Sequence, residues 1–219
     1  PEEQSIWQAV WEKLVPLHKL YACRQYLEAA AVTKLPTHQI PQLDDVNSVI
    51  RPLYGFRMLP VAGLVAPRAF LEPLADGVFL STQYIRHPSR PFYTPEPDIV
   101  HELVGHAATF AHPDFAELNR AFGRAALCSD DHRLEAIARL YWYTLEFGVV
   151  KENDELRVYG AGLLSSFGEL EQFAKAQLKP FDLAIISETP YDPTTFQKCL
   201  FVAPTFPEMV ETLLDWLKA

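Results

Sequence analysis

Two histidines in residues 93–106, YTPEPDIVHELVGH, are the clearest candidates for chemistry in this chain. His101 and His106 are five positions apart, and the acidic Glu102 follows the first of them. An α-helix advances about 100° per residue, so positions i and i+5 lie about 140° apart. The two imidazoles can therefore converge on one ion only if His101 lies at a helix end or the helix is distorted near Gly105. Zinc peptidases instead carry HExxH, with both histidines on one helical face, so the spacing argues against that class.

A third metal ligand is expected elsewhere, and Glu146 is the best candidate. It lies in the segment LEAIARLYWYTLEFG, which is otherwise strongly apolar and aromatic. A buried carboxylate is disfavoured unless it is paired or bound to a cation. Two histidines and one carboxylate with open coordination positions form the facial triad of non-haem Fe(II) oxygenases. From these residues alone, an iron site and ordinary structural roles for the same side chains are about equally favoured.

Two other classes of function stay open at this point. One is a zinc-dependent hydrolase that uses Glu102 as a general base, which the five-residue spacing disfavours. The other is a ligand-binding protein without catalytic activity, which the presence of a complete ligand set disfavours. Iron binding and activity assays distinguish these alternatives.

Helical periodicity dominates the elements that must position these residues. It predicts helices at residues 2–32, 43–52, 113–129, 132–148, 162–177 and 207–219. Strand patterns are short and lie around Phe79, Val158 and Phe201. Eighteen prolines mark ordered loops such as residues 86–97, where binding residues are often placed. The expected fold class is mainly α with a few short β-strands.

Composition limits the class of protein. A chain of 219 residues with 49% hydrophobic content is enough for one domain with a large core, so residues 1–219 are expected to form a single domain. A net charge of −9 disfavours nucleic acid or an anionic membrane as a partner. The cysteines, Cys23, Cys128 and Cys199, contain no CxxC pair, which is typical of a reducing compartment. No apolar run is long enough to span a bilayer and no signal peptide is visible, so a cytoplasmic protein is expected.

Several long blocks resemble the pterin-dependent aromatic amino acid hydroxylases. The blocks YTPEPDIVHELVGH, RLYWYTLEFG and VYGAGLLSSFGEL look like three signatures of that family, and PQLDDVN, YGFRMLPVAGLV, STQYIRH and TFQKCLFV resemble it in the same order. The resemblance extends from about Trp7 to the last helix. It implies the catalytic-domain fold of the family, closest to the phenylalanine hydroxylase type. Neither a regulatory domain nor a tetramerising helix is recognisable, so a monomer is expected.

The resemblance also implies cofactors and an activity. Fe(II) would be held by His101, His106 and Glu146, and the enzyme would use tetrahydrobiopterin and O2 to hydroxylate the ring of an aromatic amino acid. The leading expectation is the conversion of L-phenylalanine to L-tyrosine. By family register, the pterin site would comprise Gly63, Leu64, Val65, Phe70, Glu102 and Tyr141, with the ring of Phe70 stacked on the heterocycle.

The substrate site follows from the same register. Arg86 is a natural partner for an α-carboxylate because a guanidinium can form a bidentate, charge-assisted pair. Trp142 is similar to the phenylalanine and tyrosine types, and Val202 is apolar where the tyrosine type places Asp; both favour phenylalanine. The complete expected substrate set is Arg86, Thr94, Pro95, Glu96, Trp142, Phe147, Gly162, Ser165 and Val202.

The chain also departs from the family pattern. Leu80 stands where animal members usually have His, the sequence AATF follows His106 instead of VPLF, and Pro67 and Ala69 alter the pterin loop. Changes near the ring could reposition the substrate. Meta-hydroxylation of phenylalanine and hydroxylation of tryptophan therefore stay open as alternatives.

Overall fold

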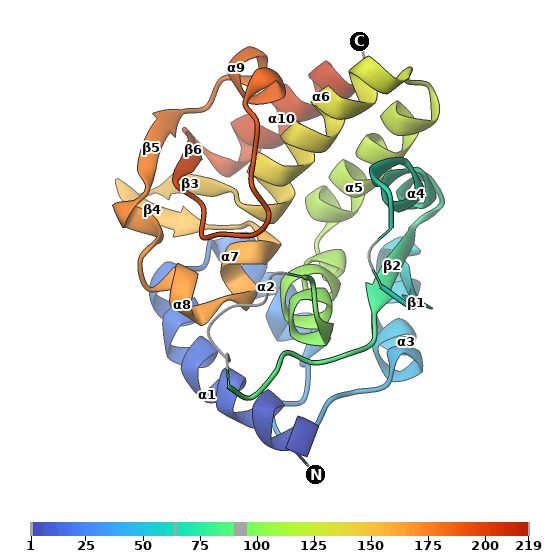
Figure 1. The fold of residues 1–219 in the computed structure, drawn as a ribbon, viewed down its shortest axis with the longest axis vertical. Coiled ribbons are helices and arrows are strands. Elements are labelled where there is room, and N and C mark those ends of the chain that lie inside the picture. The colour runs from blue at the N-terminus through green and yellow to red at the C-terminus, as the bar shows by residue number, and fades with distance from the viewer. Residues whose placement is uncertain (1, 64, 90–95, 219) are drawn as a thin grey trace.

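The N-terminal region folds into two helices in place of the single helix predicted for residues 2–32. The structure is a computed structural model that describes residues 2–63, 65–89 and 96–218 (Figure 1). Helix α1 (Glu2–Tyr21) ends before Ala22, and α2 (Arg24–Thr33) begins after Cys23. Ala22 forms a β-bridge with Val158, and the Cys23 N–H donates to the Val158 carbonyl at 2.9 Å. Pairing with a distant strand thus interrupts a segment whose local periodicity is helical throughout.

A small parallel sheet follows. Helix α3 (Leu43–Tyr54) leads into β1 (Arg57–Val61), which pairs in parallel with β2 (Val78–Thr82), with Arg57 opposite Val78. The short helix α4 (Pro67–Leu71) and the 3-10 turn η1 (Glu72–Asp76) connect the two strands. The strand predicted around Phe79 is confirmed as β2. Strand β1 was not predicted. It contains Pro60, which is tolerated because β1 is an edge strand of a two-stranded sheet.

The helices of the central region include two π-helical segments. These are η2 (His101–Ala107), which is followed by the 3-10 turn η3 (Thr109–Ala111), and η4 (Trp142–Glu146), which continues directly from α6 (Asp131–Tyr141). Helix α5 (Pro113–Leu127) lies between η3 and α6. The helices predicted at 113–129 and 132–148 are confirmed, but the last turn of the second is π-helical. Both π-helices carry candidate metal ligands.

The C-terminal third contains a four-stranded sheet in the order β4-β3-β6-β5. Its strands are β3 (Val149–Glu152), β4 (Glu155–Val158), β5 (Gln177–Pro180) and β6 (Cys199–Ala203). The connecting elements and the final helix are α7 (Ala161–Ser165), α8 (Phe167–Leu170), η5 (Phe173–Lys175), α9 (Leu183–Glu188) and α10 (Phe206–Lys218). The strands predicted near Val158 and Phe201 are confirmed as β4 and β6. The single helix predicted at 162–177 is wrong, because Ser166 has an extended backbone (φ −116°, ψ 93°) and Gln177 already pairs with Cys199 in the sheet.

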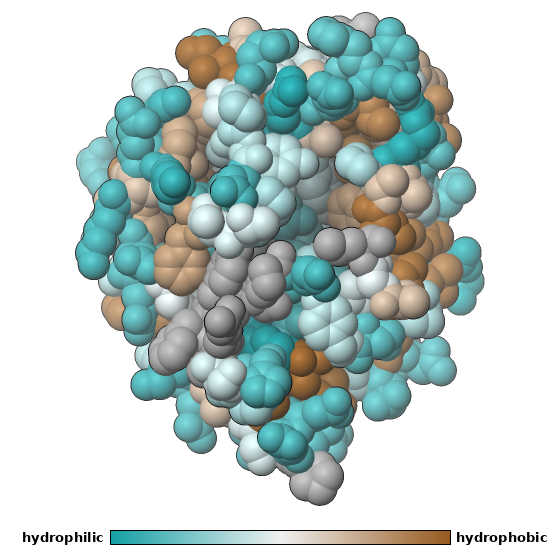
Figure 2. Space-filling view, viewed as in Figure 1, coloured by the Kyte–Doolittle hydropathy of each residue, from teal (hydrophilic) through white to brown (hydrophobic). Residues whose placement is uncertain are grey.

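One hydrophobic core connects these parts. It runs from Ile6 in α1 to Leu217 in α10 and includes fully buried rings such as Trp7 and Tyr159. In Figure 1, η2 is the green helix at the centre, and α7 lies beside it. Figure 2 shows that polar residues cover most of the outline of the same face, with hydrophobic residues at its right, around β1 and β2. No helix in the described part of the chain is long and apolar enough to cross a membrane.

Candidate metal centre and its cavity

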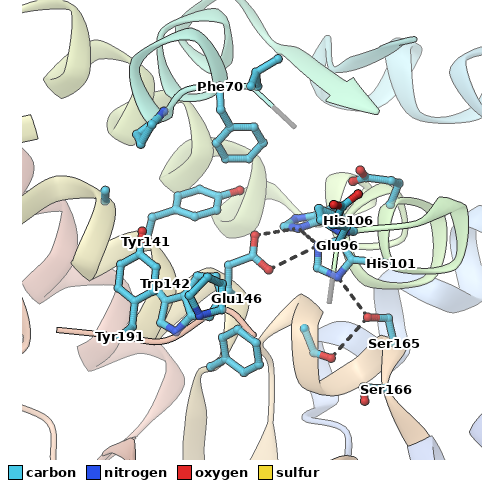
Figure 3. A pocket seen from close by; sticks show the side chains of 18 of the residues that line it. Phe70, Glu96, His101, His106, Tyr141, Trp142, Glu146, Ser165, Ser166 and Tyr191 are labelled. Carbon is cyan, nitrogen blue, oxygen red and sulfur yellow. Dashed lines mark hydrogen bonds and ion pairs between the residues drawn. The ribbon is translucent and has the colours of Figure 1, made fainter. Parts of the chain in front are cut away.

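A cavity of about 560 Å³ lies where the two π-helices, α7, α8 and the loop before β6 meet. Its walls are mostly apolar, with a few convergent polar groups, which is typical of sites for small molecules. Figure 3 shows Glu146 at its centre, between the two histidines and a group of aromatic side chains. The described residues that line it include all three candidate metal ligands.

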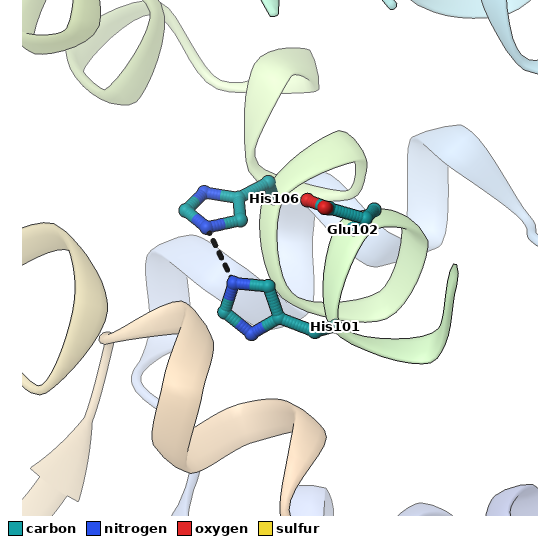
Figure 4. A group of neighbouring side chains, drawn as sticks. All are labelled: His101, Glu102 and His106. Atoms are coloured by element: carbon teal, nitrogen blue, oxygen red, sulfur yellow. Dashed lines mark hydrogen bonds between the residues drawn. The ribbon is translucent and has the colours of Figure 1, made fainter. Parts of the chain in front are cut away.

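The π-helix η2 brings its two histidines together. The Nε2 atoms of His101 and His106 lie 3.0 Å apart, with the imidazole edges facing each other (Figure 4). In a π-helix the backbone bonds from i to i+5, as the Ala108 N–H does to the Leu103 carbonyl, so residues five apart share a face. The local helix distortion that the spacing predicted is therefore confirmed.

The carboxylate of Glu146 meets this pair from the opposite side of the cavity. Its oxygens lie 3.0 Å from Nε2 of His106 and 3.4 Å from Nε2 of His101. Glu146 ends the second π-helix, where the Phe147 N–H again reaches the carbonyl five residues before it, at Trp142. The carboxyl group is buried, with 9% of the residue exposed. Two π-helical segments thus aim their functional groups at one point.

Ser165 fixes the proton on His101. The Ser165 hydroxyl donates its only hydrogen to the Ala161 carbonyl at 2.7 Å, so it accepts from Nδ1–H of His101 at 3.1 Å. His101 therefore presents the lone pair of Nε2 to His106 and Glu146. A hydrogen bond to the other ring nitrogen is how proteins orient a metal-binding histidine.

Charge and burial act on the same three groups. Burial lowers the pKa of His101 to about 4, which keeps the ring neutral. Burial also lowers the pKa of His106, but the Glu146 carboxylate more than offsets this and the net pKa is raised. Burial raises the pKa of Glu146, and the two histidines reverse this effect, so the carboxyl group is ionised. A neutral imidazole and an ionised carboxylate are the forms that bind metal.

The arrangement fits a cation. Three electron-rich atoms converge within 3.0–3.4 Å, and the one hydrogen on Nε2 of His106 cannot satisfy both of its neighbours. Ligand bonds of about 2.1 Å that meet at right angles place neighbouring ligand atoms about 3.0 Å apart. The nitrogen and oxygen set with an open side suits the facial triad of a non-haem iron site.

Glu102 is a second carboxylate near the histidines, with a carboxylate oxygen within 4.8 Å of a ring nitrogen of each. Its oxygen Oε1 accepts from the Thr82 hydroxyl at 2.8 Å and from the Thr82 N–H at 3.1 Å. Figure 4 shows its carboxylate away from the facing Nε2 edges. Burial raises the pKa of Glu102 to about 7. Glu146 is therefore the better third ligand, and Glu102 is better placed for a hydrogen bond to a molecule in the cavity.

The residues that the resemblance assigns to the pterin lie partly around the cavity. Val65, Phe70, Glu102 and Tyr141 line it, and the rings of Phe70 and Tyr141 meet edge to face at 5.4 Å. Gly63 is not among the described lining residues, although Val65, two residues later, is. Leu64 lies outside the described residues.

Arg86 sits in a buried ion pair rather than on the surface. Its Nε and Nη2 donate to the two carboxylate oxygens of Asp98, each at 2.8 Å, and Nη1 donates to the Ser165 carbonyl at 3.2 Å. Burial raises the pKa of Asp98, but Arg86 more than offsets this, so the net pKa is lowered. Asp98 also accepts from the His101 N–H at 3.1 Å. One carboxylate therefore holds both the guanidinium at the cavity wall and the first turn of η2.

Most of the other expected substrate residues also line the cavity. These are Glu96, Trp142, Phe147, Gly162 and Ser165. A Cβ on Gly162 would lie 2.6 Å from the Phe147 ring, so glycine permits this close approach. Thr94 and Pro95 lie outside the described residues. Val202 is not among the described lining residues; it lies within β6, paired with Val149 and Pro180, and its expected place at the substrate stays a prediction.

Sequence reasoning missed the loop before β6 and the residues after Ser165. Tyr191, Pro193 and Thr194 line the cavity, as do Ser166 and Glu169. The proline-rich sequence PYDPT marked a loop, but nothing in its pattern showed which wall it would cover.

Two of the departures from the family pattern lie away from the cavity. Leu80 is half-buried and is not among the described lining residues, whereas its neighbour Phe79 is. Ala107 and Ala108 are buried behind His106, and the Thr109 hydroxyl donates to the His106 carbonyl at 2.7 Å. The AATF departure therefore changes the support of η2 rather than the lining of the cavity. Pro67, in contrast, does line it.

Comparisons with known proteins agree with this geometry. The family described as "Biopterin-dependent aromatic amino acid hydroxylase" matches residues 1–219. The Drosophila melanogaster protein henna is 44% identical over 211 residues, which cover 94% of this chain and 47% of that protein. Human phenylalanine-4-hydroxylase is 43% identical over 221 residues, which cover 98% of this chain and 49% of that protein. The chain thus spans about half the length of these two relatives.

Solved structures match over almost the whole chain. Phenylalanine hydroxylase from Chromobacterium violaceum, with bound iron(III) and 7,8-dihydrobiopterin, has a TM-score of 0.91 at 30% identity and covers 99% of this chain and 81% of that one. The cold-active phenylalanine hydroxylase from Colwellia psychrerythraea has a TM-score of 0.91 at 33% identity and covers 99% and 85%. The expected fold is therefore confirmed.

Proposed function

The chain belongs to the biopterin-dependent aromatic amino acid hydroxylase family, and we propose that it hydroxylates the ring of L-phenylalanine to give L-tyrosine, using Fe(II), a tetrahydrobiopterin and O2. The convergence of His101, His106 and Glu146 at one side of a largely apolar cavity carries this proposal. Several relatives are named for this reaction on phenylalanine, which supports the choice of substrate.

In this proposal His101, His106 and Glu146 hold the iron. When bound, iron and tetrahydropterin together supply the activation of O2 and the redox chemistry. The chain supplies orientation: Ser165 holds the His101 ring with Nε2 toward the ion, and the two π-helices keep the three ligands on one side. The opposite side stays open for small molecules. The walls are mostly apolar, and polar interactions made beside such walls are stronger than they are in water.

The pterin is proposed to bind at the Phe70 side of the cavity. Phe70 and Tyr141 provide aromatic faces there, and Val65 provides apolar contact. Glu102, held by Thr82, would exchange a proton or accept a hydrogen bond from the heterocycle. A pKa of about 7 suits either role at neutral pH.

The amino acid is proposed to bind between Arg86 and the Trp142 wall. Arg86 is oriented by Asp98 and would attract the α-carboxylate, while the aromatic groups would pack against the phenyl ring. Ser165, whose carbonyl already accepts from Arg86, links this end of the cavity to the iron ligand His101.

The decisive test is anaerobic reconstitution with Fe(II), followed by tetrahydrobiopterin, O2 and phenylalanine, tyrosine or tryptophan in separate reactions. Products are identified by mass and by retention against ring-position standards. We expect the product from phenylalanine to have gained the mass of one oxygen atom and to comigrate with tyrosine. Comigration with the meta isomer, or product from tryptophan alone, would replace the proposed specificity and keep the chemistry. Bound iron without an oxygenated product from any of the three would contradict the function.

We further propose that residues 1–219 form a single, monomeric, cytoplasmic catalytic domain without nucleic acid or membrane partners. Among the described residues, the four most exposed large hydrophobic side chains are those of Leu20, Val32, Leu127 and Ile185. They lie on four different helices, and isolated exposed residues of this kind are ordinary. The cysteines are free, as is usual in a reducing compartment. Light scattering tests the monomer, and fractionation of the source cell tests the location.

A further inference from the structure

Glu169 is a buried acid at the cavity that the proposed chemistry does not use. It lies in α8, is 3% exposed, and forms no ion pair among the described residues. It lines the cavity of the metal centre and also a second cavity of about 530 Å³. Burial raises the pKa of Glu169 to about 7, an effect that one hydrogen bond partly reverses. Burial of a carboxyl group at this position lowers the free energy of unfolding, whereas burial of an apolar side chain would not.

The partner in that hydrogen bond is the backbone of Gln197. The Gln197 N–H donates to Oε1 of Glu169 at 2.6 Å, a short contact typical of a strong hydrogen bond to a carboxylate. The two residues are 28 positions apart and come from α8 and from the loop before β6. Glu169 therefore fixes the position of this loop relative to α8.

The side chain of Gln197 holds the loop and the cavity wall together. Its Nε2 donates to the carbonyls of Asp192 and Thr195, both at 3.1 Å, so the loop closes on itself. Its Oε1 accepts from the indole N–H of Trp142 at 3.0 Å. Because Nε2 can only donate and Oε1 can only accept, these three hydrogen bonds fix the orientation of the Gln197 amide.

Trp142 is the centre of the aromatic wall. Its ring stacks on Tyr191 with ring centroids 4.3 Å apart (Figure 3), and it packs on Phe147 with centroids 4.6 Å apart. Tyr191 belongs to the same loop as Gln197, and both aromatic neighbours line the cavity. A displacement of Gln197 would therefore move the indole hydrogen bond and the stacked ring together.

We propose that Glu169 is a positioning residue that sets the aromatic wall of the amino acid site by holding the Gln197 backbone, which in turn holds Trp142. The inference rests on the proposed function only for the identity of the ligand. Glu169 acts on ring binding through geometry and does not touch the iron ligands. Its removal should weaken amino acid binding more than it slows the chemical step.

The test compares Glu169→Leu and Glu169→Gln with wild type, and uses Glu171→Leu as the control because Glu171 is an exposed acid two residues away. The indole resonance of Trp142, assigned with Trp142→Phe, is followed by 1H–15N NMR in protein that carries diamagnetic Zn(II) at the metal site. The KM for phenylalanine and kcat are measured with Fe(II).

For Glu169→Leu we expect a shifted Trp142 indole resonance and hydrogen exchange about 10-fold faster, the effect of losing one hydrogen bond to a charged group. KM should rise about 10-fold while kcat changes less than about threefold. Glu169→Gln keeps an acceptor oxygen without the charge and should lie between wild type and Glu169→Leu. Glu171→Leu should match wild type in every readout.

An unmoved Trp142 resonance and unchanged exchange in Glu169→Leu would overturn the inference, as would equal effects of Glu171→Leu. If Glu169→Leu does not fold, Glu169→Gln decides: faster exchange of the Trp142 indole supports the inference, and wild-type exchange overturns it. The NMR readout needs no turnover. Wild-type protein that fails to hydroxylate phenylalanine would therefore contradict the proposed function, while the role of Glu169 would still be decided by NMR.

Discussion

The Nε2 atoms of His101 and His106 lie 3.0 Å apart although the two residues are five positions apart in the chain. An α-helix would place them on different faces, so the π-helical turn of η2 is what turns a sequence motif into half of a metal site. The second π-helix supplies Glu146. Both segments that supply metal ligands therefore contain π-helical turns, which are wider than α-helical turns.

Removal of a ligand should abolish iron binding. We expect Glu146→Gln and His106→Ala to lower Fe(II) affinity at least about 100-fold, more than the loss of an outer-shell partner, and to eliminate product while circular dichroism stays close to wild type. Anaerobic calorimetry measures the affinity. His132→Ala, which removes an exposed histidine of α6, is the control and should bind as wild type does. Normal iron occupancy in both variants would exclude these residues from the site.

The ion pair of Arg86 and Asp98 should be costly to break. Asp98→Asn leaves the guanidinium buried without a counter-charge, and we expect a loss of about 3–5 kcal/mol in the free energy of unfolding together with a higher KM for phenylalanine. Urea denaturation and steady-state kinetics measure the two effects. Asp215→Asn breaks the exposed pair with Lys218 and should cost less than about 1 kcal/mol. Equal costs for the two variants would show that burial of the pair does not matter.

Close packing of η2 on α7 should make Gly105 intolerant of a side chain. A Cβ at this position would lie 2.7 Å from the carbonyl oxygen and 2.9 Å from the Cβ of Ala161. We expect Gly105→Ala to destabilise the protein by about 1–3 kcal/mol and to weaken Fe(II) binding, because the π-helix has to move. Gly63→Ala, where a Cβ would meet nothing within 4 Å, is the stability control. A stable Gly105→Ala protein with full iron affinity would contradict this view of η2.

His18 should make stability depend on pH. It is buried, its Nε2–H donates to the Leu164 carbonyl at 2.7 Å, and burial lowers its pKa from 6.5 to about 4. As the pH falls, the unfolded chain therefore binds a proton at His18 before the folded protein does. The contribution of neutral His18 to the free energy of unfolding is complete above pH 6.5 and is lost as the pH falls toward 4. The wild type should lose about 2 kcal/mol more than His18→Gln between pH 7 and pH 5. Urea denaturation of both proteins measures this, and parallel pH profiles would contradict it.

The site was more predictable from sequence than the path of the chain around it. The spacing of His101 and His106 required a distorted helix, and the isolated acid Glu146 in an aromatic helix required a partner; both expectations rest on local physics and the structure shows both features. The break at Cys23 and the end of the predicted helix at Gln177 depend instead on pairing with strands far away in the sequence. Periodicity contains no information on such pairing.

The loop before β6 also could not be predicted from local patterns. The family resemblance implied Val202 as a substrate residue but gave no indication of Pro193, which lies in the loop before β6 and lines the cavity. The contacts of Gln197 that shape this loop join residues up to 55 positions apart. No pattern within a single segment could have indicated them.

Asp98 gives the two halves of the site a common support, since it binds the Arg86 guanidinium and the His101 N–H with the same carboxylate. A displacement of Asp98 at the Arg86 end would therefore also displace the first turn of η2. If a metal at the histidines and a carboxylate at Arg86 both act on Asp98, each must change the affinity of the other by the same factor. The metal ligand His101 and the guanidinium of Arg86 thus depend on one buried carboxylate for their positions.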